Sequence, residues 1–269
     1  MRLNKYIAHH TRYSRREADR LIEAGEVTVN RRPMTEYGYD VRSGDRVAVK
    51  GRLVKERRSG EVTLVVYHKP KGVLVTKKDD RGRATIYHKL PGKFRHFVPI
   101  GRLDYASEGL LLLTDAPEVA EAYMRSALPR TYNIKIEGGL SEAMVTAMRE
   151  GLTLEDATAG GHEASPLTRM TFAPFAGWEE RGRSGKYTKL RVTITEGKNR
   201  EIRRFFAHFG AKVVDLKRVA YGPIELNNLP ENKTRYFTQK EYDEHHAFMK
   251  KWRKKQRREK ETRKAAPES

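Results

Sequence analysis

Residues 97–114 read FVPIGRLDYASEGLLLLT, a stretch that sets two charged side chains between apolar segments. The apolar segments have the composition of core strands, so Arg102 and Asp104 would lie beside the core. A carboxylate removed from water favours its neutral form unless a cation lies next to it. An ordinary turn at these two residues explains the same pattern equally well.

A cation is available in residues 196–206, EGKNREIRRFF. If residues 199–209 form a helix, four apolar side chains recur at helical spacing and face the core: Ile202, Phe205, Phe206 and Phe209. Three arginines then share a neighbouring face: Arg200, Arg203 and Arg204. An arginine beside a core stripe can reach into the protein, although a solvated or phosphate-binding face is an equally good interpretation.

The elements around these two stretches predict the fold class. Strands are expected at residues 62–67, 73–76, 110–114, 131–137, 167–172, 190–196 and 212–220, and helices at 117–126, 142–150 and 199–209. Their order is irregular rather than a strict strand and helix repeat. We therefore predict an α+β domain with a mixed, largely antiparallel sheet and flanking helices.

The first 50 residues predict a small module of two helices followed by strands. Residues 14–17, SRRE, form a capping box for the second helix, which Gly25 ends. The outward positions carry one sign of charge: Arg12, Arg15, Arg16, Arg20, Arg31 and Arg32. Because a solvated face usually mixes signs, this face favours binding of RNA or DNA over a merely solvated helix surface.

The charge pattern completes the expected organisation. The module at 1–50 is followed by a linker at 51–60, the main domain at 61–238 and a basic tail at 239–269. Residues 250–264 of the tail read KKWRKKQRREKETRK, which cannot bury apolar area. We expect this run to be a solvated helix or disordered until it meets phosphate.

Composition excludes several classes of protein. The 269 residues include 55 Lys and Arg against 35 Asp and Glu, a net charge of +20, and no cysteine. Thiol catalysis, disulfides and Cys-ligated metals are excluded, and no apolar run reaches the roughly 18 residues of a membrane span. The adjacent histidine pairs at 9–10 and 245–246 are interpreted as surface residues. We expect a cytoplasmic protein with a polyanionic partner, of which nucleic acid is the commonest.

Taken in order, these segments resemble the family of pseudouridine synthases that modify uridines in small- and large-subunit ribosomal RNA. The resemblance covers about residues 1–240. SRREADRLIEAGEVTVN (14–30) resembles the RNA-binding module named after ribosomal protein S-four. The motifs of the synthase domain are resembled by KPKG (69–72), GRLDYASEGLLLLTD (101–115), RTYNIKIEG (130–138) and EGKNREIRRFF (196–206).

The resemblance implies roles for single residues. Asp104 matches the catalytic aspartate, Arg203 the arginine paired with it, and Tyr132 the aromatic residue that packs on uracil. Arg102 matches the arginine that holds the target strand. From the 196–206 stretch itself we expect Ile202 to pack the other side of the base and three side chains to contact RNA: Lys198, Arg200 and Arg204. Isomerisation of uridine changes no oxidation state, so neither cofactor nor metal is expected.

The implied partner is ribosomal RNA or an assembling ribosomal subunit, with no membrane, and the chain is expected to act as a monomer. How the carboxylate begins the cleavage of the glycosidic bond stays open. A non-catalytic RNA-binding or ribosome-assembly factor that retains the fold is the alternative, and a generic DNA-binding protein is a third. Asp104, Tyr132 and Arg203 together favour catalysis, because a protein without chemistry has no reason to keep a desolvated ion pair.

Overall fold

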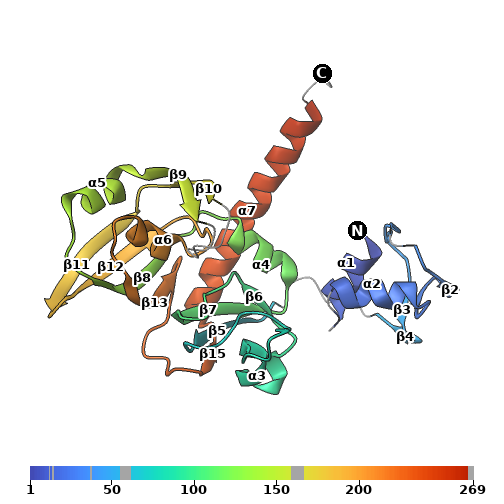
Figure 1. The fold of residues 1–269 in the computed structure, drawn as a ribbon. Helices are drawn as coiled ribbons and strands as arrows, with labels where there is room; N and C mark the ends of the chain where they lie inside the picture. The colour runs from blue at the N-terminus through green and yellow to red at the C-terminus, as the bar shows by residue number, and fades with distance from the viewer. Residues whose placement is uncertain (12, 14, 37, 55–61, 159–166, 266–269) are drawn as a thin grey trace. The chain divides into compact units, whose positions relative to one another are not determined.

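The computed structural model describes residues 1–269 except 12, 14, 37, 55–61, 159–166 and 266–269 (Figure 1). The chain forms two compact units. One comprises Met1–Thr63 with Asp115–Pro117, and the other comprises Leu64–Thr114 with Glu118–Ser269.

The smaller unit packs two helices on a four-stranded sheet. Its elements are α1 (Leu3–His10), α2 (Arg15–Glu23), β1 (Val27–Val29), β2 (Arg32–Pro33), β3 (Val47–Val49) and β4 (Arg52–Leu53), with the strand order β2-β1-β3-β4. Leu3, Ile7 and Ile22 are fully buried in one core with the sheet residue Val27, also fully buried. This arrangement confirms the predicted module of helices and strands. Ser14 of the predicted capping box lies outside the described residues.

The structure differs from the predicted linker at its start. β4 pairs antiparallel with β3, and Val54 joins the core of the smaller unit at 8% exposure. Residues 51–54 therefore belong to the folded unit. The sequence does not reveal this, because two paired residues and one buried valine leave no periodic pattern in a charged stretch. Residues 55–60 of the predicted linker lie outside the described residues.

The larger unit is built on a nine-stranded sheet with the order β11-β12-β8-β13-β7-β5-β15, to which β14 and β6 add at β13 and β7. The strands are β5 (Leu64–Lys69), β6 (Val98–Ile100), β7 (Glu108–Thr114), β8 (Arg130–Glu137), β11 (Gly177–Ser184), β12 (Tyr187–Ile194), β13 (Val213–Tyr221), β14 (Ile224–Glu225) and β15 (Thr234–Tyr236). Every pair is antiparallel except β7 with β13. The predicted mixed, largely antiparallel α+β class is confirmed.

Helices and a two-stranded sheet complete this unit: α3 (Ile86–Lys89), the 3-10 turn η1 (Gly92–Phe94), α4 (Pro117–Met124), α5 (Glu142–Glu150), α6 (Glu201–His208), α7 (Gln239–Ala265), β9 (Leu152–Thr158) and β10 (Leu167–Phe172). The predicted strand at 73–76 is not formed, since Leu74 makes only an isolated bridge to Thr85. α6 buries Ile202, Phe205 and Phe206, as the helical spacing predicts.

One glycine fixes the approach of the two parallel strands. Gly109 in β7 has φ +108°, and a Cβ atom there would lie 2.2 Å from the carbonyl oxygen of Arg218 in β13. Only a residue without a side chain allows this contact, because no real Cβ atom comes so close. Gly109 thereby fixes the position of the first residues of β7, which follow directly on the 101–107 segment.

Candidate active site

The turn at residues 104–107 connects the segment after β6 to β7, and the backbone carbonyl groups of all four residues are engaged. The N–H of Ser107 donates to the carbonyl of Asp104 at 3.1 Å, which closes the turn. Gly72 N–H donates to the carbonyl of Tyr105 at 2.8 Å. The carbonyls of Ala106 and Ser107 accept from charged side chains described next. A turn held at every carbonyl fixes the direction in which the Asp104 side chain leaves the backbone.

A fully buried lysine holds this turn from one side. Lys69, the last residue of β5, donates from Nζ to the carbonyls of Asp104 (3.1 Å), Ser107 (2.8 Å) and Pro70 (2.9 Å). Burial lowers the pKa of Lys69 to about 8, and the nearby charges of Asp104 and Glu108 oppose that shift. Three acceptors satisfy its three N–H donors, so Lys69 acts as a structural cross-link between β5 and the turn.

Arg203 of α6 holds the turn from the other side. Its Nη1 donates to the carbonyl of Val213 at 2.7 Å, and its Nη2 donates to the carbonyl of Ala106 at 3.1 Å and to Ser107 Oγ at 3.2 Å. Its Nε lies 3.8 Å from Oδ2 of Asp104. Burial lowers the pKa of Arg203, and the Asp104 carboxylate counteracts that effect. The structure thus brings Asp104 and Arg203 together as an ion pair longer than a hydrogen bond.

The Asp104 side chain, 28% exposed, lines a cleft of about 600 Å³. Tyr132 of β8 and Ile202 of α6 also line it, and both are more than 90% buried. Their burial keeps most of each side chain in the core and leaves a small apolar surface facing the cleft. A carboxylate, an aromatic ring and an aliphatic side chain therefore border one space, which suits a flat and partly apolar ligand.

The cleft wall holds two further arginines to which the sequence assigns no role, Arg218 and Arg130. Arg218 of β13 is 3% exposed and is the register partner of Tyr132, so that the two side chains leave the same face of the sheet. Its Nε donates to the carbonyl of Leu110 at 2.7 Å, whereas its buried Nη2 has no partner among the described residues. Arg218 stands in LKR, a triplet that carries no periodic or motif signal.

Arg130 holds the loop between β12 and α6. Its Nη1 donates to the carbonyls of Thr195 (2.9 Å) and Glu196 (3.2 Å), and its Nη2 donates to Oη of Tyr221 at 2.9 Å. Its guanidinium also lies 4.7 Å from the centre of the Tyr221 ring. This arginine opens the RTYNIKIEG stretch, which makes it visible in the sequence without indicating its role.

The other predicted RNA contacts of the larger unit are arranged around the cleft. Arg102 is exposed in its wall, and Arg200 lines it at the start of α6 with φ +51°. Lys198 also lines it, but its ammonium is paired with Glu196 at 2.6 Å. Arg204 is not among the lining residues of this cleft, and burial lowers its pKa.

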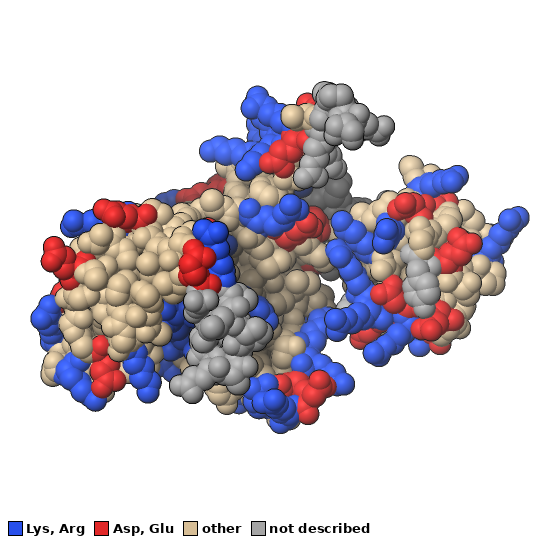
Figure 2. Space-filling view, turned by 45° about the horizontal axis from the view of Figure 1, so that its top comes forward, with Lys and Arg blue, Asp and Glu red and all other residues tan. Residues whose placement is uncertain are grey.

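The predicted arginines of the smaller unit lie on its own surface. Those that the structure describes are exposed on α2 and on the hairpin of β1 and β2: Arg15, Arg16, Arg20, Arg31 and Arg32. Arg12 lies outside the described residues. Figure 2 shows Lys and Arg side chains gathered along one side of this unit, with Asp and Glu side chains beside them.

Among the residues that the structure describes, no group of three or more His, Cys, Asp or Glu side chains is placed to hold a metal ion. No described helix is both long enough and apolar enough to span a bilayer.

Comparisons with known proteins agree with the fold. The model of the RNA pseudouridylate synthase family matches residues 63–208, and that of the S4 domain matches residues 1–47. An uncharacterised RNA pseudouridine synthase of Helicobacter pylori is 49% identical over 93% of this chain and 95% of its own length. The ribosomal large subunit pseudouridine synthase B of Bacillus subtilis is 33% identical over 88% of this chain and 92% of its own length.

A solved structure of a pseudouridylate synthase matches with a TM-score of 0.61 and 25% sequence identity, over 91% of this chain and 99% of that one. The resemblance expected from the motifs is therefore confirmed at the levels of sequence and fold. The chain belongs to the RNA pseudouridylate synthase family: it is a pseudouridine synthase, an isomerase with an N-terminal S4 domain.

Proposed function

We propose that this chain converts a specific uridine of ribosomal RNA to pseudouridine, with Asp104 as the catalytic carboxylate. The isomerisation breaks the bond between N1 of uracil and C1′ of ribose, joins C1′ to C5 of the same base, and moves the proton of C5 to solvent while N1 gains one. The ribosomal substrate is supported by the relatives of Bacillus subtilis and Escherichia coli named for the large ribosomal subunit.

One observation carries the proposal, namely the way in which Asp104 is held. A carboxylate in a partly dry cleft stays ionised when a cation lies beside it. Arg203 provides that cation at 3.8 Å, outside hydrogen-bond range, and uses its own donors on the turn and on β13. The carboxylate oxygens therefore lie beside a cation and are still available to a reacting ribose or base, as both a nucleophile and a base require.

The walls of the cleft support a flipped-out nucleotide. A uridine inside a helix cannot bring its glycosidic bond to a recessed carboxylate, so it must leave the stack. We assign the uracil to the space between Tyr132 and Ile202. Arg218 adds a hydrogen-bond donor beside Tyr132, and because buried donors are rarely left unpaired, an oxygen of the bound nucleotide is its expected acceptor.

The test removes the chemistry of the carboxylate and keeps its shape. In cells that lack the gene, plasmids would supply the wild type, Asp104→Asn, or the control Asp80→Asn, whose side chain is 87% exposed. We expect one pseudouridine of ribosomal RNA to vanish with the deletion, to return with the wild type and the control, and to stay absent with Asp104→Asn. In single turnover with purified protein, the loss should be at least about 100-fold.

The outcomes separate the parts of the proposal. A folded Asp104→Asn protein that still forms pseudouridine would remove Asp104 from the chemistry. Loss of a pseudouridine from transfer RNA, with ribosomal RNA unchanged, would overturn the assignment of the substrate and leave the catalytic role intact.

A further inference from the structure

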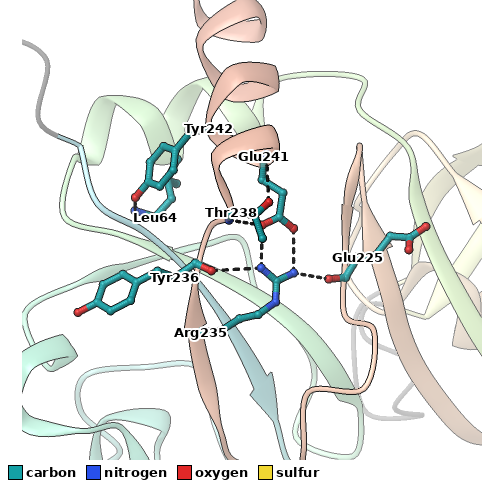
Figure 3. Close-up of polar contacts among 7 residues, drawn as sticks. All are labelled: Leu64, Glu225, Arg235, Tyr236, Thr238, Glu241 and Tyr242. Atoms are coloured by element: carbon teal, nitrogen blue, oxygen red, sulfur yellow. Dashed lines mark hydrogen bonds and ion pairs between the residues drawn. The ribbon is translucent and has the colours of Figure 1, made fainter.

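The C-terminal helix α7 is anchored to the larger unit at its first turn (Figure 3). Arg235 of β15 donates two hydrogen bonds to the Glu241 carboxylate, from Nη1 to Oε2 at 2.7 Å and from Nη2 to Oε1 at 2.8 Å. Its Nη2 also donates to the carbonyl of Glu225 at 2.7 Å. Thr238 and Glu241 complete a capping box, with the N–H of Thr238 donating to Glu241 Oε2 at 2.8 Å and the N–H of Glu241 donating to Thr238 Oγ1 at 3.3 Å. The start of the helix is therefore fixed in direction as well as in position.

The next two turns are also part of the fold. The N–H of Leu64 donates to Oη of Tyr242 at 3.1 Å. In the interior, Oη of Tyr123 in α4 lies within hydrogen-bond distance of Nδ1 of His245, at 3.1 Å. His245 and Met249 are 3% and 6% exposed. The predicted tail is thus two different segments, a packed one up to Met249 and an exposed one after it, and the interpretation of His245 as a surface residue is wrong.

The exposed segment has an unusual charge. Residues 250–258 carry seven cations and no acid, and all seven side chains are exposed: Lys250, Lys251, Arg253, Lys254, Lys255, Arg257 and Arg258. Figure 2 shows Lys and Arg side chains gathered around this end of α7. Like charges four residues apart repel by about 0.2–0.5 kcal/mol per pair. Exposed ion pairs to Glu259 and Glu261 relieve part of this repulsion, and a polyanion would relieve the rest.

The segment is nevertheless helical through Ala265, for a physical reason. Helix nucleation is the costly step, and the packed turns before Met249 have already met that cost. Propagation through Lys, Arg and Gln is easy because they are good helix formers. At 1.5 Å per residue, residues 250–265 therefore extend the anchored helix by about 24 Å. Figure 1 shows α7 as one continuous helix that runs outward to the C-terminal end.

We propose that residues 250–265 are a rigid arm that binds the phosphate backbone of a double-stranded RNA segment next to the target uridine. The inference rests on the proposed function, since it takes RNA as the substrate. A duplex fits better than a single strand, because single-strand platforms pair cations with exposed aromatic rings. The aromatic residue here, Trp252, is half-buried and stacks on Phe248 at 6.4 Å.

The rigid connection has a consequence that a flexible tail lacks. Phosphate contacts fix the register of a protein on nucleic acid when their geometry is fixed. Because α7 is anchored to the unit that holds the cleft, the arm sets a distance between the duplex and Asp104. The arm should therefore contribute to the choice of uridine as well as to affinity, which a solvated or disordered tail would not do.

Two variants separate charge from rigidity in the full-length protein. The charge variant combines Lys254→Gln, Arg257→Gln and Arg258→Gln, which keep helix propensity. Its matched control combines Arg181→Gln, Arg183→Gln and Lys186→Gln, which remove the same charge from exposed positions at the β11 and β12 hairpin. The hinge variant keeps every cation and inserts four Gly and Ser residues between Met249 and Lys250.

Affinity for a plain 20-base-pair RNA duplex is measured at several salt concentrations. We expect the charge variant to bind at least tenfold more weakly at low salt, and the slope of log affinity against log salt to fall by about 0.9 for each phosphate that the arm no longer neutralises. The hinge variant should keep most of that slope. The pseudouridine yield at the target in ribosomal RNA, however, should fall at least tenfold for the hinge variant at limiting enzyme and stay unchanged for the control.

Each outcome decides one point. A charge variant with the slope of the control would overturn the arm as an RNA-binding element, and a hinge variant with full yield would overturn its rigid role. The duplex measurement contains no uridine isomerisation, so it can fail while Asp104 still proves catalytic. Conversely, an inactive wild type that binds the duplex through the arm would contradict the proposed function alone.

Discussion

Gly109 shows how one atom can decide the site. Its missing Cβ lets β7 approach the carbonyl of Arg218, and the turn that carries Asp104 leaves from this end of β7. We expect Gly109→Ala to lower the free energy of unfolding by more than about 3 kcal/mol, because φ +108° and a 2.2 Å contact act together. Urea denaturation measures this loss.

A matched control separates the clash from the backbone strain. Gly138 has φ +91° and nothing within 4 Å of the position that a methyl group would take. Gly138→Ala therefore carries the strain alone and should cost about 1–2 kcal/mol. Equal losses in the two variants would show that the contact with Arg218 relaxes without cost.

Arg218 makes a second prediction at this scale. Its Nε is used by the carbonyl of Leu110, and its Nη2 is the donor expected to meet the nucleotide. Arg218→Lys should keep the charge and lose the forked geometry, and we expect kcat/KM to fall about 10- to 100-fold, in line with about 1–3 kcal/mol for a lost hydrogen bond to a buried partner. Unchanged kcat/KM with a folded protein would make Arg218 a structural residue of the sheet.

The site shows which residues a sequence can reveal. Asp104 and Arg203 can be identified because each belongs to a recognisable motif next to an apolar pattern. Lys69 lies in KPKG without a role that the sequence could assign, since its function depends on carbonyls from residues 35 and 38 positions away in the chain. The partners of Arg130 and Arg218 are equally remote, and no spacing rule announces them.

At the scale of elements, the anchor of α7 predicts a dependence on pH. Burial, together with the charges of His246 and Arg253, lowers the pKa of His245 to about 4. The unfolded chain, with a pKa near 6.5, therefore takes up the proton first as the pH falls. Stability is unaffected by this group above about pH 6.5 and is lost between pH 6.5 and 4, by about 3 kcal/mol in total.

The measurement compares urea midpoints of the wild type, His245→Gln and the exposed control His208→Gln between pH 7.5 and 4.5. Both tryptophans, Trp178 and Trp252, belong to the larger unit, so their fluorescence follows its unfolding. His245→Gln should flatten the decline of stability with acid, whereas His208→Gln should parallel the wild type. Parallel curves for all three proteins would mean that His245 is protonated in the fold.

The elements that the sequence misses lack the pattern on which prediction relies. β11 reads GWEERGRS and exposes nearly every side chain, so it shows no apolar alternation and is held by backbone pairing with β12. β4 has two residues. At residues 73–76 the sequence predicts a strand that does not form. Val73 is buried in the core without strand pairing, and an apolar run alone cannot distinguish a buried strand from a buried loop.

At the scale of the whole molecule, positive charge is divided between structures with different geometry. The smaller unit carries arginines on α2 and on a hairpin whose turn residues, Asn30 and Arg31, have φ +53° and +66°. A non-glycine residue in that conformation costs about 1–2 kcal/mol, so the hairpin presents Arg31 at some expense of stability. The larger unit holds the cleft and the arm. Binding and chemistry are therefore expected to respond to different substitutions.

The full-length variant that combines Arg15→Gln, Arg16→Gln and Arg20→Gln tests this division. All three side chains are exposed, so the fold should persist. Affinity for ribosomal RNA should weaken, and the slope of log affinity against log salt should fall by about 0.7–0.9 for each phosphate that is no longer neutralised. The single-turnover rate at saturating RNA should stay at the wild-type value, because the pocket is untouched.

The triple Gln variant of the β11 and β12 hairpin is again the control. A slope equal to that of the control would make these arginines a solvated surface, and recognition would then depend on the cleft and α7, the two charged surfaces that the larger unit holds in fixed relation.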